Sequence, residues 1–84
     1  MKSLKIKSLE SKNSSVFVSW ESDLDDISMI KVVLDDDGSS TNLGVDPSAT
    51  TATIPEVDPG KYLITVSALT PAGWVKSETL VITV

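Results

Sequence analysis

The side chains of this chain that could do chemistry are carboxylates, hydroxyls and lysines, because its 84 residues include no cysteine, histidine or arginine. Without cysteine there are no disulfides, thiolate metal ligands or thiol nucleophiles. Without histidine the commonest general base and transition-metal ligand is missing, so no imidazole can activate a hydroxyl. We therefore expect a chain that is not an enzyme and that binds no cofactor.

Two clusters of aspartate are the candidates for metal binding. One consists of Asp23, Asp25 and Asp26, and the other spans residues 35–37. Calcium takes roughly six to eight oxygen ligands, some of which neighbouring aspartates can supply. The second cluster lacks the alternate-residue spacing of an EF-hand loop, and consecutive strand residues point to opposite faces. We expect solvated acidic loops and no metal, with the first cluster as the candidate to test.

The charge distribution argues against a nucleic-acid partner. Seven lysines stand against twelve acidic residues, which gives a net charge of −5, and there is no guanidinium to bind phosphates or base edges. The basic residues gather at the start, where residues 1–12 hold four lysines and one glutamate. Lysines on an outer strand discourage edge-to-edge pairing, so we expect a protected edge strand there.

No segment has the length and hydropathy of a signal peptide or a membrane span. Leu4, Ile6 and Leu9 are separated by lysines, whereas a membrane-spanning helix needs about 20 mostly apolar residues. We expect no membrane span.

Apolar residues alternate with polar ones in short segments, which is the pattern of half-buried β-strands. Valine, isoleucine and threonine, which favour strands, supply much of them. We expect strands near residues 4–9, 14–20, 30–34, 52–54, 62–68 and 80–84, and a further one at 42–45, where nearby glycines lower the strand propensity. The predicted core residues are Trp20, Ile30, Val32, Ile54, Tyr62, Ile64, Val66, Leu80 and Ile82.

Turn signals separate these segments. Residues 35–38 end in glycine and predict a hairpin, while Asp58-Pro59-Gly60 and Pro71-Ala72-Gly73 carry further turn residues. Six or seven short strands at such spacing predict an all-β fold with two packed antiparallel sheets. The length allows a single domain over residues 1–84.

The order of these segments resembles a fibronectin type III domain, with a general immunoglobulin-like domain as the close alternative. The resemblance is carried by Trp20, Ile30-x-Val32-x-Leu34, Ala52-x-Ile54-x-x-Val57 and Asp58-Pro59-Gly60-Lys61-Tyr62. It implies a seven-stranded antiparallel Greek-key β-sandwich in which the Tyr62 hydroxyl bonds to backbone near residues 56–59, the tyrosine corner. It also implies a non-catalytic module. No Arg-Gly-Asp is present, so integrin binding is not implied.

One face of the predicted sandwich is unusually apolar. In the sheet formed by the third strand and the last two, the family's C–F–G sheet, the outward residues include Met29, Val33, Leu63, Leu69 and Val81. Trp74, in the loop before the last predicted strand, is a candidate aromatic anchor for a partner. The alternative is that its ring folds back over the core. We expect this face to bind a protein partner or to mediate self-assembly, although β-propensity and shielding by Lys31 would also explain it.

These observations favour a module for protein–protein interaction or structural docking, with an extracellular or virion-associated location. A small phage virion component, for capsid decoration or the tail, is the first hypothesis. The alternatives are a spacer or adhesion domain of a secreted multidomain bacterial protein, a carbohydrate- or calcium-dependent binding module that uses Trp74 and the loop aspartates, and an engineered binding scaffold.

Overall fold

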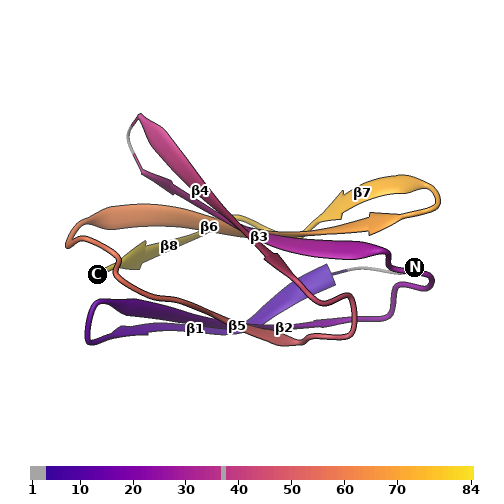
Figure 1. Cartoon of the computed structure of the whole chain (residues 1–84), viewed down its shortest axis with the longest axis horizontal. Coiled ribbons are helices and arrows are strands. Elements are labelled where there is room, and N and C mark those ends of the chain that lie inside the picture. Colours follow the sequence, from indigo (N-terminus) through magenta and orange to yellow (C-terminus); the bar gives the residue numbers. More distant parts are fainter. Residues whose placement is uncertain (1–3, 37) are drawn as a thin grey trace.

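The computed structural model describes residues 4–36 and 38–84. Two antiparallel sheets face each other and enclose the core between them (Figure 1). The fold is therefore the all-β sandwich that the alternation predicts. Its strands are β1 (Leu4–Lys12), β2 (Ser15–Ser22), β3 (Met29–Asp36), β4 (Ser39–Val45), β5 (Thr51–Ile54), β6 (Lys61–Thr70), β7 (Gly73–Lys76) and β8 (Leu80–Thr83).

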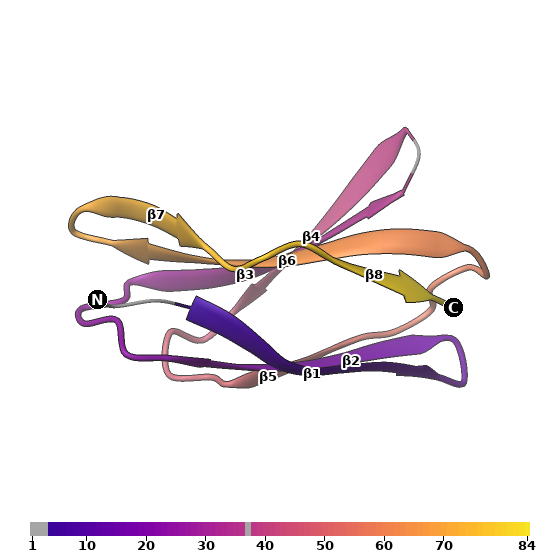
Figure 2. The same cartoon turned by 180° about the vertical axis from the view of Figure 1, so that it is seen from behind.

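The smaller sheet has the strand order β1-β2-β5, and the larger has the order β4-β3-β6-β7, with β8 also pairing with β6. The chain changes sheets between β2 and β3, between β4 and β5, and between β5 and β6. Seen from behind, β1 begins in the half of the molecule that holds the β6–β7 hairpin, and β8 finishes near the opposite end of the long axis (Figure 2). Among the described residues no helix is long and apolar enough to cross a membrane.

The structure has eight strands rather than seven because β7 forms over Gly73–Lys76, where the sequence predicts a loop that carries Trp74. β7 pairs with residues 67–70 of β6, and β8 pairs with residues 61–64 of the same strand. Between them the chain leaves the ladder at residues 77–79. β8 occupies the position predicted for the last strand, whereas Trp74 lies in a strand and not in the predicted loop.

β4 is longer than the sequence suggests. It runs over seven residues and pairs with β3 in unbroken register from Asp36 opposite Ser39 to Ile30 opposite Val45. The preceding turn uses Gly38 at a φ of 110°, a region that favours glycine. The β3–β4 hairpin extends beyond the body of the sandwich (Figure 1). Gly44 does not interrupt β4, because its neighbours supply enough pairing.

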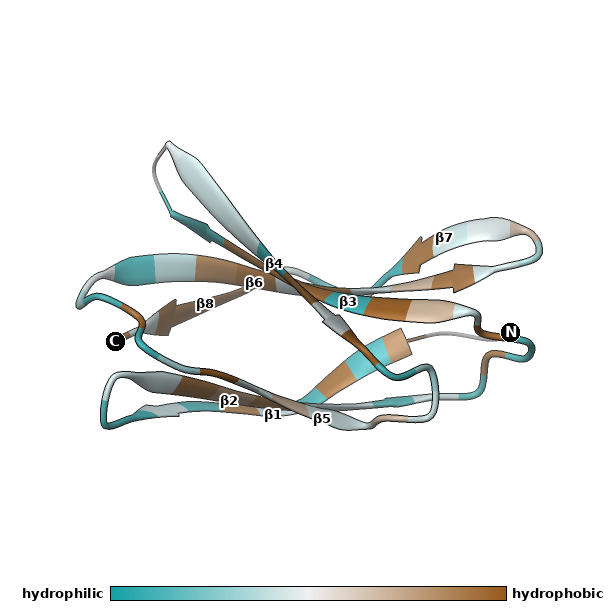
Figure 3. Cartoon of the chain, viewed as in Figure 1, coloured by the Kyte–Doolittle hydropathy of each residue, from teal (hydrophilic) through white to brown (hydrophobic). Residues whose placement is uncertain are grey.

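The core is formed by the inward side chains of both sheets. Figure 3 shows apolar residues recurring along β2, β3 and β6. Leu80, predicted as a core residue, is half-buried and packs against the core from the start of β8. The other predicted core residues are buried, namely Trp20, Ile30, Val32, Ile54, Tyr62, Ile64, Val66 and Ile82.

The turn before β6 has the predicted tyrosine corner. The Tyr62 hydroxyl donates to the backbone carbonyl of Asp58 at 2.7 Å. The backbone groups of Gly60 and Val84 exchange two further hydrogen bonds, of 2.8 and 3.1 Å. Burial, and then the nearby carboxylates of Asp36 and Asp58, raise the pKa of Tyr62. The turn is thereby tied both to the strand that follows it and to the end of the chain's last strand.

Candidate interaction surface

The outer face of the larger sheet has its side chains in rows that cross the strands. The first row, which we call the Trp74 row, consists of Met29 on β3, Leu69 on β6 and Trp74 on β7, paired directly across the ladder. Met29 and Trp74 are 48% and 43% exposed, and Leu69 is half-buried. Three of the residues predicted for the interaction face are thus brought together at one end of the sheet.

The next row is polar. Lys31, Ser67 and Lys76 lie opposite one another on β3, β6 and β7, and we call them the lysine row. Ser67 is only 2% exposed although it lies on the outward face. Long lysine side chains on both neighbouring strands account for this, since their aliphatic stems cover adjacent surface while the charge stays in water.

Beyond the lysine row, Val33 is half-buried opposite Thr65, whose hydroxyl is 2.8 Å from that of Thr79. Leu63 and Val81 then lie opposite each other on β6 and β8, with exposures of 45% and 54%. Five of the six expected apolar residues therefore form two groups, the Trp74 row and the Leu63–Val81 pair, and the half-buried Val33 lies between these groups. They do not form one continuous patch, because the lysine row and two threonines separate them.

Lys31 contacts the ring of Trp74. Its Nζ lies 4.9 Å from the centroid of the indole ring. Lys31 is paired with Ser67 and Trp74 with Leu69, so the lysine side chain crosses β6 diagonally to reach the ring. A cation–π contact at an exposed site contributes about 0.5–1 kcal/mol. Trp74 lies on the outer face, opposite Leu69 in the ladder, and does not fold back over the core, where the neighbouring Val75 packs instead.

A shallow hollow of about 400 Å³ follows the lysine row along the face. Most of its lining is polar, which suits a hydrated contact rather than a dry pocket. It is lined by Lys31, Val33, Asp35, Asn42, Thr65, Ser67, Lys76, Ser77 and Thr79.

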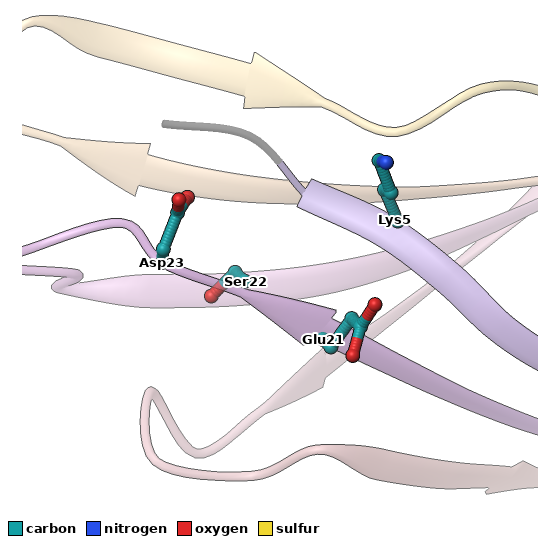
Figure 4. Close-up of a pocket in the computed structure, with 4 residues that line it drawn as sticks. All are labelled: Lys5, Glu21, Ser22 and Asp23. Carbon is teal, nitrogen blue, oxygen red and sulfur yellow. The ribbon is translucent and has the colours of Figure 1, made fainter. Parts of the chain in front are cut away.

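The acidic loop after β2 lies on a different part of the molecule. Figure 4 shows Asp23 just beyond the end of β2, near Glu21 and Ser22, with Lys5 on the adjacent β1; these four residues line a hollow of about 300 Å³. Asp26 has a left-handed φ of 56°. Within residues 4–36 and 38–84, no group of three or more acidic residues is arranged to hold a metal ion. Asp37, a member of the second aspartate cluster, lies outside the described residues.

No family model and no curated protein matches this sequence. Solved structures do resemble it. The fibronectin type III domain of human collagen XX superposes with a TM-score of 0.79 over 95% of this chain and 90% of that domain, at 17% identity. The chain has a fibronectin type III-like fold. This confirms the resemblance seen in the order of Trp20, the alternating strands and Tyr62.

Two bacterial pectate lyases contain a similar fibronectin type III-like region. Pel3 of Pectobacterium carotovorum matches with a TM-score of 0.82 at 17% identity, over 98% of this chain and 27% of the lyase. PelI of Erwinia chrysanthemi, solved with tetragalacturonic acid, matches with a TM-score of 0.75 at 13% identity, over 94% of this chain and 27% of the lyase. The chain therefore spans about a quarter of the length of these enzymes, and at such identities the likeness is one of fold.

Proposed function

We propose that this fibronectin type III-like domain is a non-catalytic module that docks a protein partner through the outer face of its larger sheet. The observation that carries the proposal is the Trp74 row, in which Met29, Leu69 and Trp74 line up across three strands with two of them nearly half exposed. Aromatic residues dominate the binding energy of protein interfaces. Scattered apolar residues are ordinary on a surface, but Met and aromatic residues gathered at one place are enriched at protein interfaces.

The contact between Lys31 and Trp74 supports the same proposal. A ring held over the sheet loses little conformational freedom when a partner covers it, so more of the contact energy is available for binding. Lys31 and Lys76 give the row beside it a positive charge, although the domain as a whole is acidic. A partner that places an apolar pocket over Trp74 and carboxylates opposite the lysines would fit this face.

The experiment compares two exposed aromatic residues on opposite faces. Phe17 on β2 is 36% exposed and belongs to the other sheet, so Phe17→Ala is a matched control for Trp74→Ala. We expect self-association in sedimentation, or capture of a partner from the source organism, to be lost with Trp74→Ala and retained with Phe17→Ala. Equal behaviour of the two folded variants would contradict the proposed face.

The second candidate is an accessory domain of a secreted polysaccharide-degrading protein. It is favoured by the pectate lyases, in which a similar fold makes up about a quarter of the chain. The same face would then present an indole ring and two lysine ammonium groups to an acidic sugar chain. Calorimetry with tetragalacturonic acid tests this directly, since heat that disappears in Trp74→Ala would favour the sugar over a protein partner. The absence of heat at millimolar sugar would eliminate it.

Three other roles stay predictions. They are a phage virion component, a calcium-dependent binder and an engineered scaffold. Each of these roles is compatible with the fold, and the similarity to the collagen XX domain and to the pectate lyases does not distinguish among them. The genes that neighbour this one would separate a virion part from a secreted protein.

A further inference from the structure

Three of the four outer edges of the two sheets carry features that prevent another strand from pairing with them. β1 has three lysines along its described length and a register shift between Ile6 and Ser8. β5 is only four residues long and is followed by Pro55. The edge formed by β7 and β8 is interrupted at residues 77–79. Charge, bulges, short length and interruption are the means by which proteins block edge strands.

β4 is the fourth edge, and it lacks all of these features. Its seven residues, Ser-Ser-Thr-Asn-Leu-Gly-Val, include no charge and no proline. Its register with β3 is unbroken, and among the described residues no strand pairs with its far side. In an edge strand every second residue directs its backbone N–H and C=O away from the sheet. β4 therefore presents a regular and unpaired set of backbone hydrogen-bonding groups.

Acidic residues flank this edge at both ends. Asp36 lies at the start of the hairpin turn, where its Oδ1 accepts hydrogen bonds from the N–H and the hydroxyl of Ser39, at 3.1 and 2.8 Å. Asp46 follows the end of β4, where its Oδ1 accepts hydrogen bonds from the N–H and the hydroxyl of Ser48, at 2.9 and 2.7 Å. The bonds from Ser48 lower the pKa of Asp46, which keeps this carboxyl charged. Both charges stand beside the ends of any strand that pairs with β4.

We propose that the free edge of β4 binds an extended segment of another protein, which adds a strand to the larger sheet and carries lysine or arginine at both of its ends. Main-chain hydrogen bonds would supply the affinity, as in other cases of strand addition. The side chains that point inward from the added strand would lie beside Leu43 and Val45, which are half-buried against the core. We expect apolar residues at those positions of the partner, because they would extend the core.

A second copy of the domain fits this edge poorly. Two β4 strands paired antiparallel would bring Asp36 of one copy near Asp46 of the other at both ends of the pairing. A parallel pairing would place each aspartate beside its own counterpart. Like charges in adjacent positions are destabilising in either arrangement. The proposal goes beyond the docking face around Trp74, since it concerns the backbone edge and not the outward side chains.

The test uses a synthetic peptide of about nine residues, long enough to span β4, in which valine alternates with threonine and a lysine stands at each end. Hydrogen exchange of the full domain by NMR is measured with and without millimolar peptide. We expect slower exchange of amides within residues 39–45 and unchanged exchange in β5 and β7. The same peptide N-methylated at alternate residues cannot form the ladder, and we expect it not to bind.

The charges are tested with the double variant Asp36→Asn/Asp46→Asn, which keeps an acceptor oxygen for each serine and removes both charges. We expect it to bind the lysine-ended peptide about three to ten times more weakly. A glutamate-ended peptide should bind the unaltered domain more weakly than the lysine-ended one. The Trp74→Ala variant should bind each peptide with the same affinity as the unaltered domain does. A failure of the docking face and a failure of this edge are therefore distinguishable.

Three results would overturn the proposal. They are equal binding of the N-methylated peptide, exchange protection confined to another strand, and no protection of residues 39–45 at millimolar peptide. Dimerisation of the domain through β4 would overturn the choice of partner.

Discussion

Ser77 and Val66 are joined by a pair of hydrogen bonds at the point where β7 ends and the chain passes on to β8. The N–H of Ser77 donates to the carbonyl of Val66 at 2.8 Å, and the N–H of Val66 donates to the Oγ of Ser77 at 2.9 Å. The serine hydroxyl in turn donates to the carbonyl of Glu78 at 2.9 Å. Val66 is fully buried, so its N–H has no access to water. The side chain of Ser77 therefore replaces the backbone acceptor that a continuous strand would have supplied.

Ser77→Ala should destabilise the domain by about 1–3 kcal/mol, because it leaves the buried N–H of Val66 without an acceptor. The free energy of unfolding in urea measures this. Thr79→Ala is the control, since its hydroxyl is exposed and bonds only to that of Thr65 on the surface. Equal stability of the two variants would show that Val66 finds another acceptor.

Tyr62→Phe removes the hydrogen bond to the carbonyl of Asp58 and keeps the buried ring. A lost intramolecular hydrogen bond of about 1 kcal/mol corresponds to a fall in Tm of about 4–8 °C for a domain of this size. Calorimetry measures the fall. An unchanged Tm would mean that the hydroxyl contributes nothing to the turn.

The same residue should make the domain sensitive to alkali. The pKa of Tyr62 is raised in the folded state by burial and by the carboxylates of Asp36 and Asp58, so the unfolded chain loses this proton first. The stability that this raised pKa gives should be fully present below about pH 9, and it should be lost as pH rises through about 10 towards the pKa of the folded state. It is the single tyrosine of the chain, so its absorbance near 295 nm reports the titration directly. In Tyr62→Phe this part of the alkaline loss should vanish.

The two tryptophans should differ sharply when each is replaced by alanine. Trp20 is 3% exposed in the core, and Trp20→Ala should cost about 3–5 kcal/mol. Trp74 is exposed, and Trp74→Ala should cost less than about 1 kcal/mol, the size of its contact with Lys31. Unfolding curves give both values. The tryptophan fluorescence that remains in Trp74→Ala comes from Trp20 and should resist quenching by iodide, because this side chain is buried. A fully stable Trp20→Ala would contradict its place in the core.

Ser14→Gly should stabilise the domain. Asn13 and Ser14 connect β1 to β2 with φ values of 52° and 61°, which matches the two-residue turn that prefers Asn-Gly. A left-handed conformation costs a non-glycine residue about 1–2 kcal/mol, although glycine loses part of this gain through its greater freedom when unfolded. We expect a net gain of up to about 1 kcal/mol in denaturant midpoints. Ser15→Gly, which alters a paired strand residue, should instead destabilise.

Local patterns in the sequence predict much of this fold. Trp20 and Tyr62 lie within alternating segments, and the turn before Tyr62 carries its own proline and glycine, so the core and the tyrosine corner follow from near neighbours. The interruption between β7 and β8 at Ser77 does not follow from near neighbours. A serine that bonds to a strand distant in sequence resembles any other serine in an exposed segment. The unbroken register of β4 was also underestimated, since Gly44 lowers strand propensity locally while its pairing with β3 compensates.

The interaction surface depends on register, which the sequence specifies only through long-range pairing. Alternation alone places Lys31 on the outer face but leaves Trp74 in a loop, and it does not show that the lysine side chain crosses β6 to reach the ring. Nor does it show that Lys31, Ser67 and Lys76 form a row that divides the apolar residues. A one-residue difference in pairing would have produced a different surface from the same strands.

The positions of the first and last strands have a mechanical consequence. β1 begins in one half of the long axis and β8 finishes near the end of the other half (Figure 2), and the hydroxyl of Ser11 bonds to the carbonyl of Thr83 where the two strands approach. Tension applied between these ends acts along the strands. The hydrogen bonds of the β1–β2 and β6–β8 pairs lie across that direction. Under such a load they would be strained together in shear rather than opened one after another.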